Sequence, residues 1–311
     1  MAYVAFDLDN TLGFFELTNP LAYLWSAEFL DNPEQAKPNH PLRLSTKLKA
    51  KLKRARDRFV DSLLADRHLL NLVLRPNLDA IMEPLVTAWR AGKVRTVIMY
   101  SNTSVSYSVE LAKALIERKY NVPGMFRLLA DHWHPSRTAD RPATPPPRGE
   151  YVEPLKTITT LERLFRESIG TGGRLAKAGP KQIPLTSIMF VDDRIPKHHL
   201  EAQEAGGLTY LVPSRFVPKA TVAQRQRIFL LAIEAMNRAG LMVDDEYLDS
   251  GFCYRDIPYD WTRIQKVRGA FDLFEWVWGE IQAVRTPRAA WKPDTEVLAA
   301  TTREFLGRFT D

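Results

Sequence analysis

The sequence has little cysteine and no long apolar segment. Its 311 residues include one cysteine, Cys253, so an internal disulfide is excluded and a reducing compartment is expected. No apolar run approaches the roughly 18 residues that a membrane span requires. Because the N-terminus passes directly into a short apolar run, we expect no signal peptide and an intracellular protein, cytoplasmic or nuclear.

Zinc-binding patterns are also missing. His132 with His134, and His198 with His199, lack the accompanying cysteines or the helical spacing of a zinc site, so solvated or hydrogen-bonding roles are expected. Apolar residues make up 45% of the chain, which is enough to bury a substantial core. The length predicts one α/β domain with an extension.

Short apolar runs alternate with helical patterns along the first two thirds of the chain. This alternation predicts a Rossmann-like parallel sheet with helices between the strands. An amphipathic helix is expected from Lys156 to Phe165, and a further helix from Pro196 to Ala205, ended by Gly206 and Gly207. The expected strands cover residues 3–6, 94–100, 126–130, 187–191 and 208–212.

Two carboxylates directly follow the first expected strand, in the run Phe6-Asp7-Leu8-Asp9-Asn10-Thr11-Leu12. Alternation points Asp7 and Asp9 to the same side, at the carboxyl edge where open α/β sheets bind ligands. One carboxylate can attack phosphorus while its neighbour handles the proton, and carboxylate oxygens suit Mg²⁺. The spacing therefore favours phosphoryl transfer over a plain polar turn in which Thr11 caps a helix.

Two more expected strands end in side chains that suit the same chemistry. The second strand is followed by Ser101 and Asn102, where a hydroxyl and backbone amides can bind phosphate oxygens. The fourth is followed by Asp192 and Asp193, which would complete an oxygen-rich metal site with Asp7. A helix cap and a surface turn are the plainer interpretations, but three matching strand ends favour one shared site.

These motifs resemble the haloacid-dehalogenase-like superfamily, whose pattern is Asp-x-Asp-x-Thr, a strand-terminal Ser or Thr, a Lys and paired acids. The resemblance covers about residues 1–212. It implies an aspartyl-phosphate on Asp7, acid and base roles for Asp9, and Mg²⁺ bound by Asp7, the Asp9 carbonyl and Asp192. The residues expected at the metal are Asp7, Asp9, Asp192 and Asp193, and those expected at the phosphate are Thr11, Ser101 and Asn102.

The chain also resembles the phosphatases that act on the C-terminal domain of RNA polymerase II, the NLI-interacting-factor-like family. The similar segments are Arg75-Pro76-Asn77-Leu78 and Tyr151-Val152-Glu153-Pro154-Leu155. Asn10 occupies a position where that family usually has Glu, and Glu153 falls where its motif Lys is expected. This similarity implies a phosphoprotein substrate.

A cation is needed beside the nucleophile because it must neutralise the attacking carboxylate and the phosphoryl group together. Lys156 is predicted for this role, since it opens an expected amphipathic helix and so has a rigid support. Lys177 and Lys181 are alternatives within the glycine-rich segment 170–181. That segment lacks the residue order of a nucleotide-binding P-loop.

Inserts and an extension complete the expected organisation. Residues 13–74 are expected to form a helical cap on a 1–212 core, and residues 135–150 an irregular, proline-rich insert. Residues 213–311 are expected to form a helical extension. Its predicted helices lie near 221–239, 259–283 and 294–308, the last capped by Asp294.

Positive charge is concentrated in the expected cap. Residues 43–58 carry a net charge of +7, whereas the whole chain carries +6. Apolar residues recur there at helical spacing, which predicts an amphipathic helix with a cationic face. This face is either solvated or a contact for nucleic acid, an acidic phosphopeptide or an anionic membrane surface. The candidate contact residues are Lys47, Lys49, Lys51, Lys53, Arg54, Arg56 and Arg58.

The motifs leave two classes of function. The first is a Mg²⁺-dependent phosphomonoesterase, with phosphoprotein as the expected substrate and nucleotides or nucleic-acid ends as the alternative. The second is an inactive scaffold that binds a phosphorylated partner. The presence of both Asp7 and Asp9 favours the enzyme, because a binding module has no need of a proton-transfer residue.

Overall fold

The computed structural model describes residues 1–18, 46–103, 106–132, 134–140, 156–170, 182–194, 197–240, 275, 279 and 294–309. The chain divides into two compact units. The first comprises Met1–Phe14, Leu74–Phe216 and Ala289–Asp311, and the second comprises Phe15–Val73 and Val217–Arg288. The motifs expected to carry phosphoryl transfer all lie in the first unit, and the basic segment lies in the second.

The first unit contains a five-stranded sheet in which every strand pairing is parallel. β1 and β4 are buried along their whole length, as expected for a sheet covered on both faces. The predicted α/β class is confirmed, and the topology is compatible with a Rossmann-like fold. The strands are β1 (Ala2–Phe6), β2 (Val94–Tyr100), β3 (Phe126–Ala130), β4 (Ile188–Val191) and β5 (Thr209–Leu211), in the order β3-β2-β1-β4-β5.

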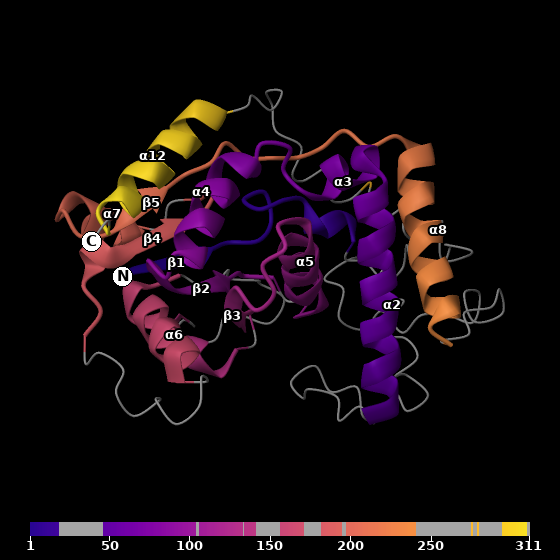
Figure 1. Ribbon diagram of the computed structural model, residues 1–311, viewed down its shortest axis with the longest axis horizontal. Helices are drawn as coiled ribbons and strands as arrows, with labels where there is room; N and C mark the ends of the chain where they lie inside the picture. Colours follow the sequence, from indigo (N-terminus) through magenta and orange to yellow (C-terminus); the bar gives the residue numbers. More distant parts are fainter. Residues whose placement is uncertain are drawn as a thin grey trace, which may run out of the picture. The chain divides into compact units, whose positions relative to one another are not determined.

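Helices connect the successive strands and cover the two faces of the sheet. In Figure 1, α4 lies on one side of the sheet and α6 on the other. The direction of winding changes between β1 and β4, and this switch point is where open α/β sheets bind their ligands. The connecting helices are α4 (Asp79–Arg90), α5 (Ser106–Lys119), α6 (Ile158–Gly170) and α7 (Lys197–Glu204).

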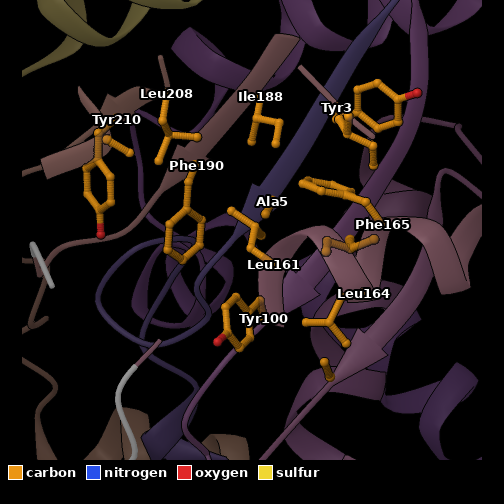
Figure 2. Packing of buried hydrophobic residues seen from close by; sticks show 14 residues of the cluster. Tyr3, Ala5, Tyr100, Leu161, Leu164, Phe165, Ile188, Phe190, Leu208 and Tyr210 are labelled. Atoms are coloured by element: carbon orange, nitrogen blue, oxygen red, sulfur yellow. The ribbon is translucent and has the colours of Figure 1, made fainter. Parts of the chain in front are cut away.

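A buried aromatic and aliphatic core lies between the sheet and α6 (Figure 2). Phe165 of α6 packs edge-on against Tyr3 of β1, with 5.5 Å between ring centroids. Phe190 of β4 contacts Tyr100 at 5.8 Å and Tyr210 at 5.4 Å. Truncating one such buried phenylalanine to alanine typically costs about 3–5 kcal/mol of stability. This packing fixes the strands at whose ends the motif residues begin.

The C-terminal residues do not form a unit of their own. α12 (Thr295–Gly307) packs on α4 and β5 in the first unit, whereas α8 (Val222–Arg238) packs along α2 (Thr46–Ala65) in the second. The helices predicted near 221–239 and 294–308 are thus present as α8 and α12, and they bury their apolar faces against different parts of the chain. The helix predicted over 259–283 lies outside the described residues, apart from residues 275 and 279.

Helices make up most of the described part of the second unit. α2 and α8 lie side by side in Figure 1. On α2, Ala55, Phe59 and Leu63 are fully buried, as their spacing predicts. α8 begins with a capping box in which Thr221 and Gln224 exchange hydrogen bonds. The remaining elements are η1 (Phe15–Leu17) and α3 (Arg67–Val73).

Two local predictions are corrected. α6 begins at Ile158 rather than Lys156, because the Thr157 hydroxyl accepts a hydrogen bond from the Thr160 amide at 3.2 Å and caps the helix there. The start of the 135–150 insert forms a short 3-10 helix, η2 (Pro135–Asp140), rather than an irregular segment. Its Arg137 is almost fully buried, so this end of the insert is anchored to the core.

A third correction concerns Asp294. This residue precedes α12 as predicted, but its side chain does not cap the helix. Its carboxylate instead accepts hydrogen bonds from the Asn77 side-chain amide and the Ser214 backbone N–H.

Among the helices of the described residues, none is long and apolar enough to cross a membrane.

Candidate active site

The site lies at the carboxyl edge of the sheet, where β1, β2 and β4 end. Phe6 pairs with both Met99 and Val191, so the three strands are in register at this edge. The backbone pairing continues one residue further, since the Asp7 N–H donates to Val191 O at 2.8 Å and the Asp192 N–H donates to Leu211 O at 3.1 Å. The two carboxylates therefore leave adjacent strands at the same level.

Three of the four predicted metal ligands come together at this edge. Asp7, Asp192 and Asp193 each offer a carboxylate oxygen, and these oxygens lie within 4.8 Å of one another. Asp9 is not part of this group, and the resemblance assigns its metal contact to the backbone carbonyl. Buried carboxylate oxygens at this spacing are ligands that a hard cation such as Mg²⁺ prefers.

Lys156 lies between two of these acids. Its Nζ donates to Asp7 Oδ1 at 2.6 Å and to Asp192 Oδ2 at 2.7 Å, and its side chain is only 6% exposed. It lies near the rings of Tyr100 and Phe190, at 5.9 and 5.6 Å from their centroids. Lys156 is therefore the predicted cation that the structure brings to Asp7, while Lys177 and Lys181 lie outside the described residues.

The three carboxylates outnumber the single buried ammonium group, and the pKa values respond to this imbalance. Burial raises the pKa of Asp192 to about 7, against the attraction of Lys156 and with repulsion from Asp7. Burial and repulsion from Asp7 raise the pKa of Asp193 to about 6. Burial acts to lower the pKa of Lys156, but Asp192 and Asp7 outweigh it and the pKa is raised.

The charge balance tests whether a divalent cation fits. Asp7, Asp192 and Asp193 bring three carboxyl groups together, against the ammonium group of Lys156 and the Arg215 side chain, whose Nε lies 4.0 Å from Asp193 Oδ2. Buried charges of one sign are strongly unfavourable unless they are paired. A Mg²⁺ ion would add positive charge beside these acids and would find its preferred oxygen ligands there, so the residues fit this cofactor.

Thr11 connects the loop after Asp7 to the acidic pair, Asp192 and Asp193. The Asp193 N–H donates to Thr11 Oγ1 at 2.9 Å, and the Thr11 hydroxyl lies 3.4 Å from Asp193 Oδ1. Thr11 is fully buried, so this hydroxyl orients protein groups. In the structure Thr11 therefore contacts Asp193. The phosphate contact that the sequence predicts for Thr11 stays a prediction.

The loop between Asp7 and Thr11 turns sharply. Asn10 has a φ of 63°, a left-handed conformation in which asparagine is favoured over most other residues. Its N–H donates to Gly13 O at 2.6 Å, which closes the turn. Asp9, at the apex, is less buried than Asp7. A residue that transfers protons to a leaving group needs this access to solvent and substrate.

The loop that follows β2 is fixed by a residue that the sequence interpretation did not identify. Arg137 donates hydrogen bonds to the Ser101 carbonyl and to Asn102 Oδ1, and its guanidinium lies 4.9 Å from the centroid of the Tyr100 ring. Ser101 Oγ accepts from the Thr103 N–H at 3.2 Å. Arg137 lies in the proline-rich segment 135–150, whose composition predicts an irregular insert and gives no sign that this arginine is buried.

Comparisons of the chain with protein-family models, curated proteins and solved structures found no match.

Proposed function

We propose that this protein is a Mg²⁺-dependent phosphomonoesterase that acts through an aspartyl-phosphate, with phosphoprotein as the substrate. The observation that carries the proposal is the contact of Lys156 with both Asp7 and Asp192 beside a third acid, Asp193. A nucleophile, a neutralising cation and a set of hard metal ligands thus occur within one buried cluster. Such groups are the parts that phosphoryl transfer requires, because its catalysis rests on positioning and charge stabilisation.

In the first step, a carboxylate oxygen of Asp7 bonds to phosphorus while the bond from phosphorus to the leaving oxygen breaks. Asp9 donates a proton to that oxygen. In the second step, Asp9 takes a proton from water, whose oxygen bonds to phosphorus as the bond to Asp7 breaks. Lys156 holds the Asp7 carboxylate and balances its charge. Bound Mg²⁺ would be held by Asp7, Asp192 and Asp193 and would supply positive charge to the phosphoryl oxygens.

The inactive-scaffold alternative would be favoured if the motif lysine were missing from the neighbourhood of Asp7. Lys156 removes that support, because its ammonium group is within hydrogen-bond distance of Asp7. Nucleotides and nucleic-acid ends remain the alternative substrates.

The basic helix α2 supports a polyanionic partner. Lys47, Lys51, Arg54 and Arg58 recur at intervals of four, three and four residues, so they form one line along the helix. Lys47, Arg54 and Arg58 are exposed, whereas Lys51 donates to Gly240 O at 2.5 Å and helps join α2 to the end of α8. We assign this line to acidic side chains of a phosphoprotein substrate.

The proposed reaction is tested by hydrolysis of an aryl phosphate. We expect activity that requires Mg²⁺ and that is almost completely lost in Asp7→Asn, since phosphate monoesters hydrolyse extremely slowly without catalysis. The amide keeps the size of the side chain but cannot form the covalent intermediate. Trapping of a phosphorylated peptide that contains Asp7 would support the mechanism directly. Equal turnover by Asp7→Asn and wild type would contradict it.

A further inference from the structure

A second buried cation, Arg75, holds the loop that carries the acidic motif. Its Nε donates to Thr11 O at 2.8 Å and its Nη2 donates to Asn10 O at 2.5 Å, while Nη2 also donates to Ser214 O. The guanidinium is fully buried. Burial lowers the pKa of Arg75 to about 10, against the attraction of Asp294 and Asp193, so it stays charged at neutral pH.

Asp294 is the acidic partner of this arginine. Its Oδ1 lies 3.5 Å from Arg75 Nη1 and accepts from Asn77 Nδ2 at 2.9 Å, and its Oδ2 accepts from the Ser214 N–H at 2.5 Å. Asp294 immediately precedes α12, which is packed on α4 and β5. One carboxylate thus joins α12, the segment after β5 and the start of α4.

The loop of residues 8–13 requires hydrogen-bond donors because Asn10 and Thr11 are buried. The Asn10 and Thr11 carbonyls lie in a buried region outside any regular strand or helix ladder, and the Asn10 carbonyl also accepts from the Phe216 N–H at 3.3 Å. A guanidinium group offers several donors in a rigid planar fork, which suits two adjacent carbonyls. The same loop is linked to the acidic pair, because the Asp193 N–H donates to Thr11 Oγ1.

We infer that Arg75 and Asp294 are positioning residues that set the nucleophile loop and, through Thr11, the metal-site acid Asp193. This inference rests on the proposed function and extends it. α12 is then a functional part of the site, although it follows the last strand by more than 80 residues in the sequence. Arg75 touches neither substrate nor metal in this assignment, so its effect is indirect.

The test uses the full chain with Asp294→Asn and Arg75→Lys, because both keep the side chain close to its original size. Partners that orient metal ligands typically change metal affinity or activity by about 10–100-fold when removed. We expect a loss of that order in Mg²⁺ affinity, measured by calorimetry without substrate. We expect a similar loss in kcat with a smaller change in KM for an aryl phosphate.

A matched control is Glu304→Gln on the same helix. Glu304 pairs with Arg308 at 3.0 Å on the exposed surface, so this change removes an acidic charge from α12 without touching the network. The control should keep wild-type Mg²⁺ affinity and kcat. A combined Arg75→Lys and Asp294→Asn variant should lose less than the product of the two single losses, because the residues act through one network.

Hydrogen exchange separates failure of this inference from failure of the proposed function. Amides of residues 8–13 should exchange faster in Asp294→Asn than in Glu304→Gln, whether or not the protein hydrolyses phosphate. If Asp294→Asn exchanges faster throughout the sheet as well, Asp294→Glu must restore slow exchange at residues 8–13 for the inference to stand. Wild-type exchange at residues 8–13 with unchanged Mg²⁺ affinity in both variants would overturn it.

Discussion

Lys156 and Arg75 in the first unit are cations like Lys47 and Arg54 in the second, but their surroundings are opposite. Lys156 and Arg75 are buried and donate to specific oxygens at 2.5–2.8 Å. Lys47 and Arg54 are exposed along one line of a helix. Solvent and salt weaken exposed charges strongly, whereas buried ones act at nearly full strength. Buried cations in the first unit are therefore fixed against specific oxygens, whereas the exposed cations of the second unit are open to solvent and salt.

The sharpest way to test the buried site is to remove its proton-transfer residue. Asp9→Asn should lower kcat for an aryl phosphate by about 10²–10⁴-fold, the usual contribution of general acid and base catalysis. The first step should suffer less with a good leaving group, which does not need protonation. A steady-state comparison of aryl phosphates with leaving groups of different pKa measures this difference. An unchanged kcat would show that Asp9 has no acid or base role.

The next largest effect is expected from the buried cation. Lys156→Met should lower kcat by about 10²–10³-fold, since it removes a preorganised electrostatic contact while keeping the side chain long and apolar. Lys113→Met is the control, because Lys113 is a partly buried lysine that donates to the Phe126 carbonyl at 2.8 Å, away from the acids. Single-turnover rates check both variants. A larger loss in Lys113→Met would contradict the role given to Lys156.

The free energy of unfolding should depend on pH because the Asp193 carboxylate is buried beside other acids. The pKa of Asp193 is raised from 3.8 to about 6, so the folded protein binds this proton more tightly than the unfolded chain does. Its stabilising contribution is present below pH 3.8 and is lost as the pH rises through 6. Without metal, Asp193→Asn should therefore be more stable than wild type by about 1–3 kcal/mol at pH 8, and by less at pH 5.

Urea unfolding in chelator at the two pH values checks this expectation. Added Mg²⁺ should reverse the order at pH 8, because it stabilises the wild-type ligand set more than a set with one amide. A stability difference that is the same at pH 5 and pH 8 would mean that the Asp193 charge is already compensated by the protein.

The smallest effect on the reaction itself should come from the exposed helix. Lys47→Gln, Arg54→Gln and Arg58→Gln together should leave aryl-phosphate turnover within about twofold of wild type, but should raise KM for an acidic phosphopeptide by about 3–30-fold at low salt. The control removes three exposed cations elsewhere, with Lys197→Gln, Lys219→Gln and Arg303→Gln. Both variants carry the same net charge, so only the position of the charge differs.

Salt dependence decides between the possible partners of α2. A phosphopeptide contact should weaken gradually from 50 to 200 mM salt, whereas a nucleic-acid contact should show a steep log-log slope of about 0.9 for each phosphate neutralised in a duplex. Equal KM values for the α2 variant and its control would mean that the cationic line is only a solvated face.

Much of the first unit could be predicted from local sequence. The five strands begin and end within one or two residues of the predicted runs, because a short apolar run bounded by polar residues can be buried in only a few ways. The motif acids were identified for the same reason, since Asp7 and Asp192 follow such runs directly. Whether those acids bind a metal or attack phosphorus stays a prediction.

The organisation of the C-terminal part could not be predicted. α8 and α12 have similar amphipathic patterns, and a pattern shows that a helix has an apolar face without showing what covers it. The helix α12 packs in the first unit, and α8 packs against α2 in the second. The side chain of Asp294 resembles a helix cap in sequence, yet its hydrogen bonds go to Asn77 and Ser214.

The sequence by itself determined the strands, the acidic motif and the location of the basic helix, because each depends on residues close together in the chain. The sequence predicted Lys156 with two alternatives, but only the tertiary structure showed that Lys156 contacts Asp7 and Asp192 and that Arg75 pairs with Asp294. Lys156 is 149 residues from Asp7, and Arg75 is 219 residues from Asp294. A buried charge is stable only beside a partner, and that partner comes from wherever the fold brings the chain together, so a local pattern can suggest the partner but cannot decide it.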